Sequence, residues 1–183
     1  MSSLQIPVRP HVKKYLLVHL GEDYDLSMGD QFGIMLVLLL RRPLKDKRKE
    51  SSMAEYTEKF SFGTDGYPAQ KWGLRSFTTG TIYLFGKFVD EVMLKEMYGQ
   101  VATNVANGQG LHDSINEWRA KYDFSDTDKS FDAVKKSYQR QRKEDRSRKV
   151  SARVSPLKAV KVVRRELLKL PIVVNGAPPR PTI

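Results

Sequence analysis

The chain of 183 residues contains no cysteine, which excludes disulfides, thiolate nucleophiles, cysteine zinc sites and iron–sulfur clusters. Histidine is scarce, with three residues, and no His/Glu pair has metalloprotease spacing. Glycine-rich phosphate loops are absent too. The best hydrophobic run, residues 32–40, has nine residues, whereas a membrane span needs about 20. The sequence therefore predicts a non-enzymatic protein without a cofactor or metal, which acts in the cytoplasm or inside a particle assembled there.

Positive charge is what the sequence has in excess. Lysine and arginine total 32 and aspartate and glutamate total 21, a formal net charge of +11. Residues 1–124 hold 16 basic and 15 acidic side chains, whereas residues 125–183 hold 16 basic and 6 acidic ones. A block of cations this concentrated predicts a polyanionic partner, with nucleic acid as the first choice.

The hydrophobic pattern predicts a mainly α-helical fold with a small β-hairpin, an α+β class. Apolar residues at helical spacing predict helices that end at Gly21, that span about 28–41, and that span about 81–107. Alternation over 54–62 predicts a strand, and 74–82 is the expected second strand of the hairpin. Residues 1–107 are therefore expected to form a helical core that also oligomerises, which makes a homo-oligomer the expected state.

Residues 108–149 have the pattern of a helix-turn-helix unit. The first expected helix carries Leu111, Ile115, Trp118 and Tyr122 on one stripe. The second begins after Lys129, with Ser130 as its N-cap. Its inward stripe is expected to be Phe131, Val134 and Tyr138, and its outward stripe Lys136, Arg140 and Lys143. A second helix with one apolar and one basic face has the geometry of a recognition helix for a DNA major groove.

The outward side of this second helix supplies the candidate DNA-binding residues. Arginine binds guanine edges bidentately, glutamine pairs with adenine, and lysine neutralises phosphate. Between residues 135 and 169 there are 14 basic and 3 acidic residues, a density that self-repulsion disfavours unless an anion offsets it. The pattern does not divide the candidates between base and phosphate contacts. They are Lys135, Lys136, Gln139, Arg140, Arg142, Lys143, Arg146, Arg148 and Lys149.

Residues 150–183 are expected to form a basic helix and an extended arm. Ser155 and Pro156 suit a helix start, and 155–169 has apolar residues along one side. This helix is interpreted as a DNA-backbone helix, a partner-binding helix or a membrane-surface helix, and the last is disfavoured because no large aromatic residue anchors it. Residues 170–183 carry four prolines and predict an extended arm. The candidate partner-binding residues are Leu157, Val160, Leu167, Ile172 and Val174.

Residues 85–143 also resemble a known class of proteins. The segments FGKFVDEV, GQGLHDSINEWRAKY and SFDAVKKSYQRQR, together with the opening IPVRPHVKKYLLVHLG, are similar to small helix-turn-helix proteins of Bacteroidetes phages and mobile elements. The resemblance implies a DNA-binding or transcription-regulating role in a host cell or a phage particle. From about Arg146 onward the chain extends beyond the short form of that pattern.

Two main functional hypotheses remain open from the sequence. In the first, the chain is a non-enzymatic protein of a phage or mobile element that binds double-stranded DNA through the basic helix and the extension. In the alternative, it is a virion structural protein, such as a neck, connector or packaged component, whose C-terminal arm binds neighbouring phage structural proteins. RNA binding is a third possibility, disfavoured because the aromatic residues that stack on bases are expected to face inward.

Overall fold

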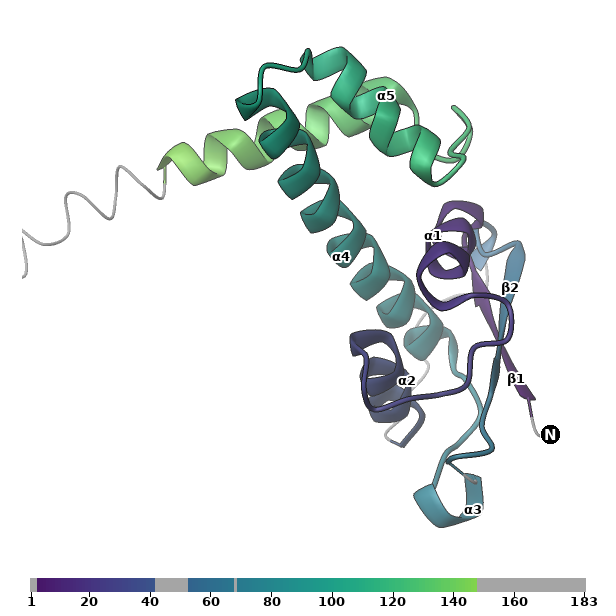
Figure 1. Ribbon diagram of the computed structural model, residues 1–183. Coiled ribbons are helices and arrows are strands. Elements are labelled where there is room, and N and C mark those ends of the chain that lie inside the picture. Colours follow the sequence, from purple (N-terminus) through teal and green to yellow (C-terminus); the bar gives the residue numbers. More distant parts are fainter. Residues whose placement is uncertain (1–2, 42–52, 68, 148–183) are drawn as a thin grey trace, which may run out of the picture. The chain divides into compact units, whose positions relative to one another are not determined.

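The computed structural model describes residues 3–41, 53–67 and 69–147 (Figure 1). Contacts divide the chain into two compact units, Met1–Gln139 and Arg140–Ile183. The boundary between the units falls inside the helix formed by residues 131–147, and so inside the predicted 108–149 unit. The predicted helix at 155–169 and the arm at 170–183 lie outside the described residues.

A two-stranded antiparallel sheet opens the first unit. Strand β1 (Ser3–Val8) pairs with β2 (Glu58–Gly63), in a register that places Ser3 opposite Gly63 and Val8 opposite Glu58. Alternate side chains of both strands point to the core, because successive residues of a strand face opposite sides. The buried ones are Ile6, Val8, Phe60 and Phe62.

The predicted hairpin partner for β2 was wrong. Residues 74–78 are not a strand, and residues 79–82 begin a helix instead. Thr78 decides this, because its hydroxyl oxygen accepts a hydrogen bond from the backbone N–H of Thr81 at 3.2 Å and so caps the helix. The strand that does pair with β2 is β1, which lies about 50 residues earlier in the sequence, where no strand was predicted.

Two short helices follow β1 in the chain. Helix α1 (Pro10–Leu20) starts with proline in its first turn and ends at Gly21, whose φ of 78° suits glycine, so the predicted stop is confirmed. Helix α2 (Gln31–Arg41) starts three residues later than expected. Asp30 caps it, because one carboxylate oxygen accepts the N–H groups of Phe32 at 2.9 Å and Gly33 at 2.8 Å.

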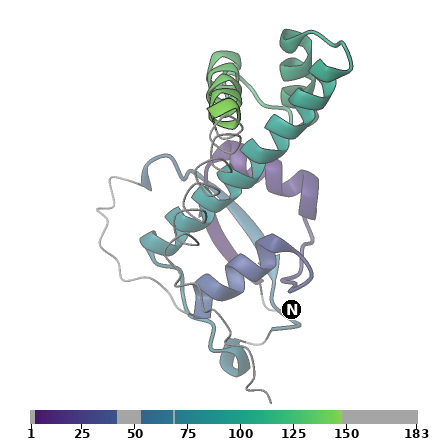
Figure 2. The same cartoon turned by 90° about the vertical axis from the view of Figure 1, so that its left-hand side faces the viewer.

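Helix α4 (Thr79–Ala106) is the central element of the first unit, and the expected helix over 81–107 is thereby confirmed. Figures 1 and 2 show α1, α2 and the sheet gathered around its N-terminal half, while α5 (Leu111–Lys121) lies against its C-terminal half. Helix α3 (Ala69–Trp72) is a single turn.

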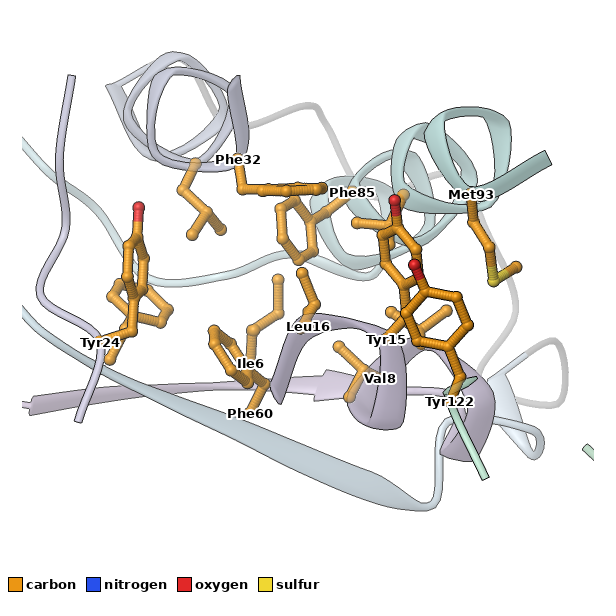
Figure 3. Packing of buried hydrophobic residues seen from close by; sticks show 14 of the residues in the cluster. Ile6, Val8, Tyr15, Leu16, Tyr24, Phe32, Phe60, Phe85, Met93 and Tyr122 are labelled. Atoms are coloured by element: carbon orange, nitrogen blue, oxygen red, sulfur yellow. The ribbon is translucent and has the colours of Figure 1, made fainter. Parts of the chain in front are cut away.

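One hydrophobic core joins the sheet to the helices. Figure 3 shows side chains from both strands, from α1, α2 and α4, and from Tyr122 just after α5 packed side by side. The fold is therefore mainly α-helical with a small two-stranded antiparallel sheet, which confirms the α+β class. Because Trp118 and Tyr122 belong to the same core as Ile6 and Phe60, α5 packs as part of the first unit.

Candidate nucleic-acid interface

Helix α5 packs its predicted stripe inward. Ile115 and Trp118 are 0% exposed and Tyr122 is 1% exposed, while Leu111 is half-buried against the same core. The Trp118 ring contacts the rings of Tyr122 and Phe124, with centroids 5.6 and 5.4 Å apart. The aromatic residues of this helix therefore hold the fold together and leave no stacking platform for bases.

The helix over 131–147 begins as predicted. The Ser130 hydroxyl oxygen accepts a hydrogen bond from the N–H of Ala133 at 3.3 Å, which confirms Ser130 as the cap. Within the first unit, Val134 is 3% exposed and Tyr138 is 4% exposed, and Phe131 is half-buried. The Tyr138 ring lies 5.3 Å from the Tyr98 ring of α4, so the predicted inward stripe does face the core.

The predicted DNA-binding residues divide by exposure. Lys135 is half-buried, with its Nζ 5.8 Å from the Phe131 ring centroid. Arg148 and Lys149, like the five candidate partner-binding residues Leu157, Val160, Leu167, Ile172 and Val174, lie outside the described residues. The others are all exposed: Lys136 and Gln139 in the first unit, and Arg140, Arg142, Lys143 and Arg146 in the second.

These cations lack the ion pairs that many of the preceding cations make. Among the described residues before 131, seven of the twelve lysines and arginines have an acidic partner; Arg9 and Asp90, for example, are 2.6 Å apart, and Lys121 and Glu96 are 2.7 Å apart. By contrast, none of the six lysines and arginines within 131–147 has a carboxylate oxygen of the described residues within 4.0 Å. Their charge is therefore not neutralised by that part of the chain, which is the condition for binding an external anion.

The connector before this helix, residues 122–130, is fixed to the core. The Lys14 Nζ of α1 lies 2.9 Å from an Asp128 carboxylate oxygen and donates to the Asp123 carbonyl at 2.6 Å. Lys129 lies 3.4 Å from Asp90 of α4. Burial raises the pKa of Asp128, but hydrogen bonds from Lys14 and Ser125 outweigh it, so that pKa lies below its usual value. The connector's acidic residues are thus partly neutralised by the core.

Glu96 of α4 is the centre of a second polar cluster, named here the Glu96 joint because it links α4 to α1 and to the end of α5. Its Oε2 accepts the Tyr15 hydroxyl at 2.7 Å, and its Oε1 accepts the Tyr122 hydroxyl at 2.5 Å and Lys121 at 2.7 Å. His19 Nε2 lies 3.3 Å from Oε2. Figure 3 shows the Tyr15 and Tyr122 rings beside each other. Both oxygens of this carboxylate already accept donors from α1 and from the end of α5, so Glu96 joins these elements structurally.

Burial and hydrogen bonding shift the pKa values of the Glu96 joint in opposite directions for the carboxyl and the two tyrosines. Burial raises the pKa of Glu96, but hydrogen bonds from Lys121, Tyr122 and Tyr15 outweigh burial and lower it to about 2. Burial first, and the adjacent Glu96 carboxylate second, raise the pKa of Tyr15 and of Tyr122 above the ordinary tyrosine value. The joint is therefore ionised at Glu96 and protonated at both tyrosines at neutral pH.

Replacing Glu96 by glutamine is expected to lower the free energy of unfolding at pH 7 by about 1–3 kcal/mol, because charge-assisted hydrogen bonds become neutral ones. Since the folded pKa of Glu96, about 2, lies below the ordinary value of 4.5 that the unfolded chain has, its contribution is fully present above about pH 4.5 and is lost as pH falls towards about 2. In urea titrations, the difference in free energy of unfolding between the variant and the wild type should therefore shrink as pH falls from about 4.5 to about 2.

The matched control is Glu91→Gln on the same helix. The Glu91 side chain is 57% exposed and lies 3.9 Å from Lys87, so its removal should change stability by less than about 0.5 kcal/mol. If the two variants behave alike, or if the Glu96→Gln deficit persists unchanged at pH 2, the joint does not stabilise the fold in this way.

A cleft in the described part of the chain has the wrong charge for nucleic acid. This cleft of about 350 Å³ beside β2 is lined by Glu22, Asp23, Asp25 and Asp65 among other residues. Four carboxylates repel phosphate. Among the described residues no group of three or more His, Asp or Glu side chains is arranged to hold a metal ion, and no helix is long and apolar enough to span a bilayer.

No protein family, curated protein or solved structure matches this chain. The candidate interface therefore depends on the geometry and charge of its own residues.

Sequence reasoning missed two polar contact sites: the ion pairs that hold the 122–130 connector to α1 and α4, and the cluster around Glu96. Glu96, Asp90 and Lys14 lie in helices whose periodic pattern gave no sign of these contacts, because their partners lie 25 to 114 residues away in sequence. The apolar and basic stripes of the 131–147 helix were predictable because they follow from local spacing.

Proposed function

We propose that the chain is a non-enzymatic protein that binds double-stranded DNA through the exposed cations of the 131–147 helix, with the basic sequence that follows it adding phosphate contacts. The observation that carries this function is the group of six unpaired lysines and arginines on a helix whose Val134 and Tyr138 are buried. A helix that buries Val134 and Tyr138 and carries six basic against three acidic side chains fits the width of a major groove and attracts phosphate. The resemblance to helix-turn-helix proteins of phages and mobile elements points the same way.

Duplex DNA is favoured over RNA by the position of the aromatic residues. Sequence-specific RNA modules expose aromatic rings on which bases stack. Here Trp118, Tyr122 and Tyr138 are at most 4% exposed. Charged contacts to a regular backbone remain as the main source of affinity, and these suit a duplex.

Salt dependence provides the test. Fluorescence anisotropy of a labelled duplex should give a binding constant that falls steeply with salt, with a log–log slope near −5 if about six phosphates are neutralised. An RNA hairpin and an acidic polypeptide serve as competitors. A slope near zero, or preferential displacement of the duplex by either competitor, contradicts duplex DNA as the ligand.

A further inference from the structure

The outward face of α2 carries apolar side chains that are exposed and that no other described residue of the first unit covers. Ile34 is 38% exposed and Leu38 is 57% exposed, and Gln31 and Arg41 are exposed as well. Spacings of three, four and three residues place these four side chains on one side of a helix. The result is an apolar strip with a polar residue at each end, a composition typical of the centre and rim of a protein interface.

The two ends of α2 carry opposite charges. Asp30 caps the N-terminal end. Arg41 stands at the C-terminal end, where its guanidinium lies 5.9 Å from the Trp72 ring centroid and no carboxylate of the described residues is within 4.0 Å. A face with an apolar middle, basic Arg41 at one end, and at the other Gln31 beside the Asp30 cap, whose second carboxylate oxygen accepts the Tyr24 hydroxyl at 2.8 Å, is complementary to itself when turned by 180°.

We propose that this face of α2 binds the same face of a second copy of the chain, with the two helices antiparallel about a twofold axis. Placing the axis on the exposed face, midway along the helix between Ile34 and Leu38, sets Ile34 against Leu38 of the other copy. The same axis sets Gln31 against Arg41, with Asp30 next to that pair. Parallel packing would instead set Arg41 against Arg41, so electrostatics selects the antiparallel arrangement. This dimer does not depend on the proposed DNA binding.

The size of the face sets the expected affinity. An 11-residue helix is about 16 Å long, so a contact through α2 alone falls short of the roughly 1,200 Å² that stable complexes bury. We therefore expect a reversible dimer that dissociates on dilution.

Sedimentation velocity of the full chain at roughly 1–500 µM should show a monomer–dimer equilibrium. Leu38→Glu should raise the dissociation constant at least about 100-fold, because each dimer contains the buried charge twice. The control is Val18→Glu, a comparably exposed apolar residue on α1 at 51%, which should leave the constant within about twofold. A protein that stays monomeric at every concentration, or equal effects of the two variants, would overturn this interface.

The antiparallel register has its own test. Arg41→Glu should weaken the dimer, and adding Gln31→Lys to it should restore the affinity, because the two substituted positions face each other across the axis. Since the chain has no cysteine, mixing Ile34→Cys and Leu38→Cys proteins under mild oxidant should also yield a disulfide-linked dimer, whereas Val18→Cys should not.

Other occupants of this face predict different results. If each cysteine variant cross-links only with itself, the helices are parallel and the proposed geometry is wrong. Sedimentation with anionic lipid vesicles that requires Leu38 and persists in a monomeric protein would assign the face to a membrane surface instead.

Discussion

Replacing Lys136, Arg140 and Lys143 together by alanine is expected to weaken binding to duplex DNA by about 100-fold near physiological salt. Each neutralised phosphate contributes about 0.9 to the log–log salt slope, so losing three contacts should make that slope shallower by nearly 3. All three side chains are exposed and unpaired within the described residues, so stability should change by less than about 0.5 kcal/mol per site. Anisotropy titrations at several salt concentrations measure both quantities.

A control with the same loss of charge separates a local interface from general basicity. Three other exposed lysines of the first unit have no carboxylate of the described residues within 4.0 Å: Lys59, Lys71 and Lys95. Their triple alanine variant lowers the net charge equally, but we expect it to change DNA affinity by less than about threefold, because no phosphate contact is removed. Equal losses in the two triple variants would mean that binding is diffuse and that the helix is not the interface.

Replacing Trp118 by alanine is expected to lower the free energy of unfolding of the first unit by about 3–5 kcal/mol. The side chain is 0% exposed and packs against two aromatic rings, so truncation leaves a large cavity. Because α5 shares one core with the sheet, the loss should destabilise the whole unit and not α5 alone.

The chain's other tryptophan makes this measurable. Trp72 of α3 is the only tryptophan left in the variant, so its fluorescence reports a distant part of the unit while circular dichroism reports the helices. Both probes should shift to lower urea together. Trp118→Phe, which keeps most of the packing, should cost distinctly less. An unchanged Trp72 transition would show that α5 folds independently.

The helices were predictable because their signals are local. Pro10, Gly21 and the apolar spacing between them define α1 within a dozen residues, and the same holds for α4 and for the helix capped by Ser130. The sheet was not predictable in this way. Pairing Ser3 with Gly63 closes a loop of about 60 residues, and no short-range pattern specifies which distant strand β2 selects.

The candidate interface, too, was predictable only where it depends on local sequence spacing. Exposure of Lys136 and Arg140 follows from helical periodicity once Val134 and Tyr138 are taken as buried. That these cations lack acidic partners could not be derived, since Lys14 and Lys129 look equally free in sequence yet contact Asp128 and Asp90. Pairing depends on which distant side chains the fold brings within reach.

The shared core limits how far the chain can be shortened. A fragment that begins after Asn107 would keep the basic helix but lose Tyr15, Glu96 and the rest of the surface that covers Trp118 and Tyr122. Two large aromatic side chains would then face water in a piece too small to bury them. The basic segment is thus dependent on its amino-terminal neighbours for solubility as well as for shape, and grafting it onto another protein would require carrying most of residues 3–139 along.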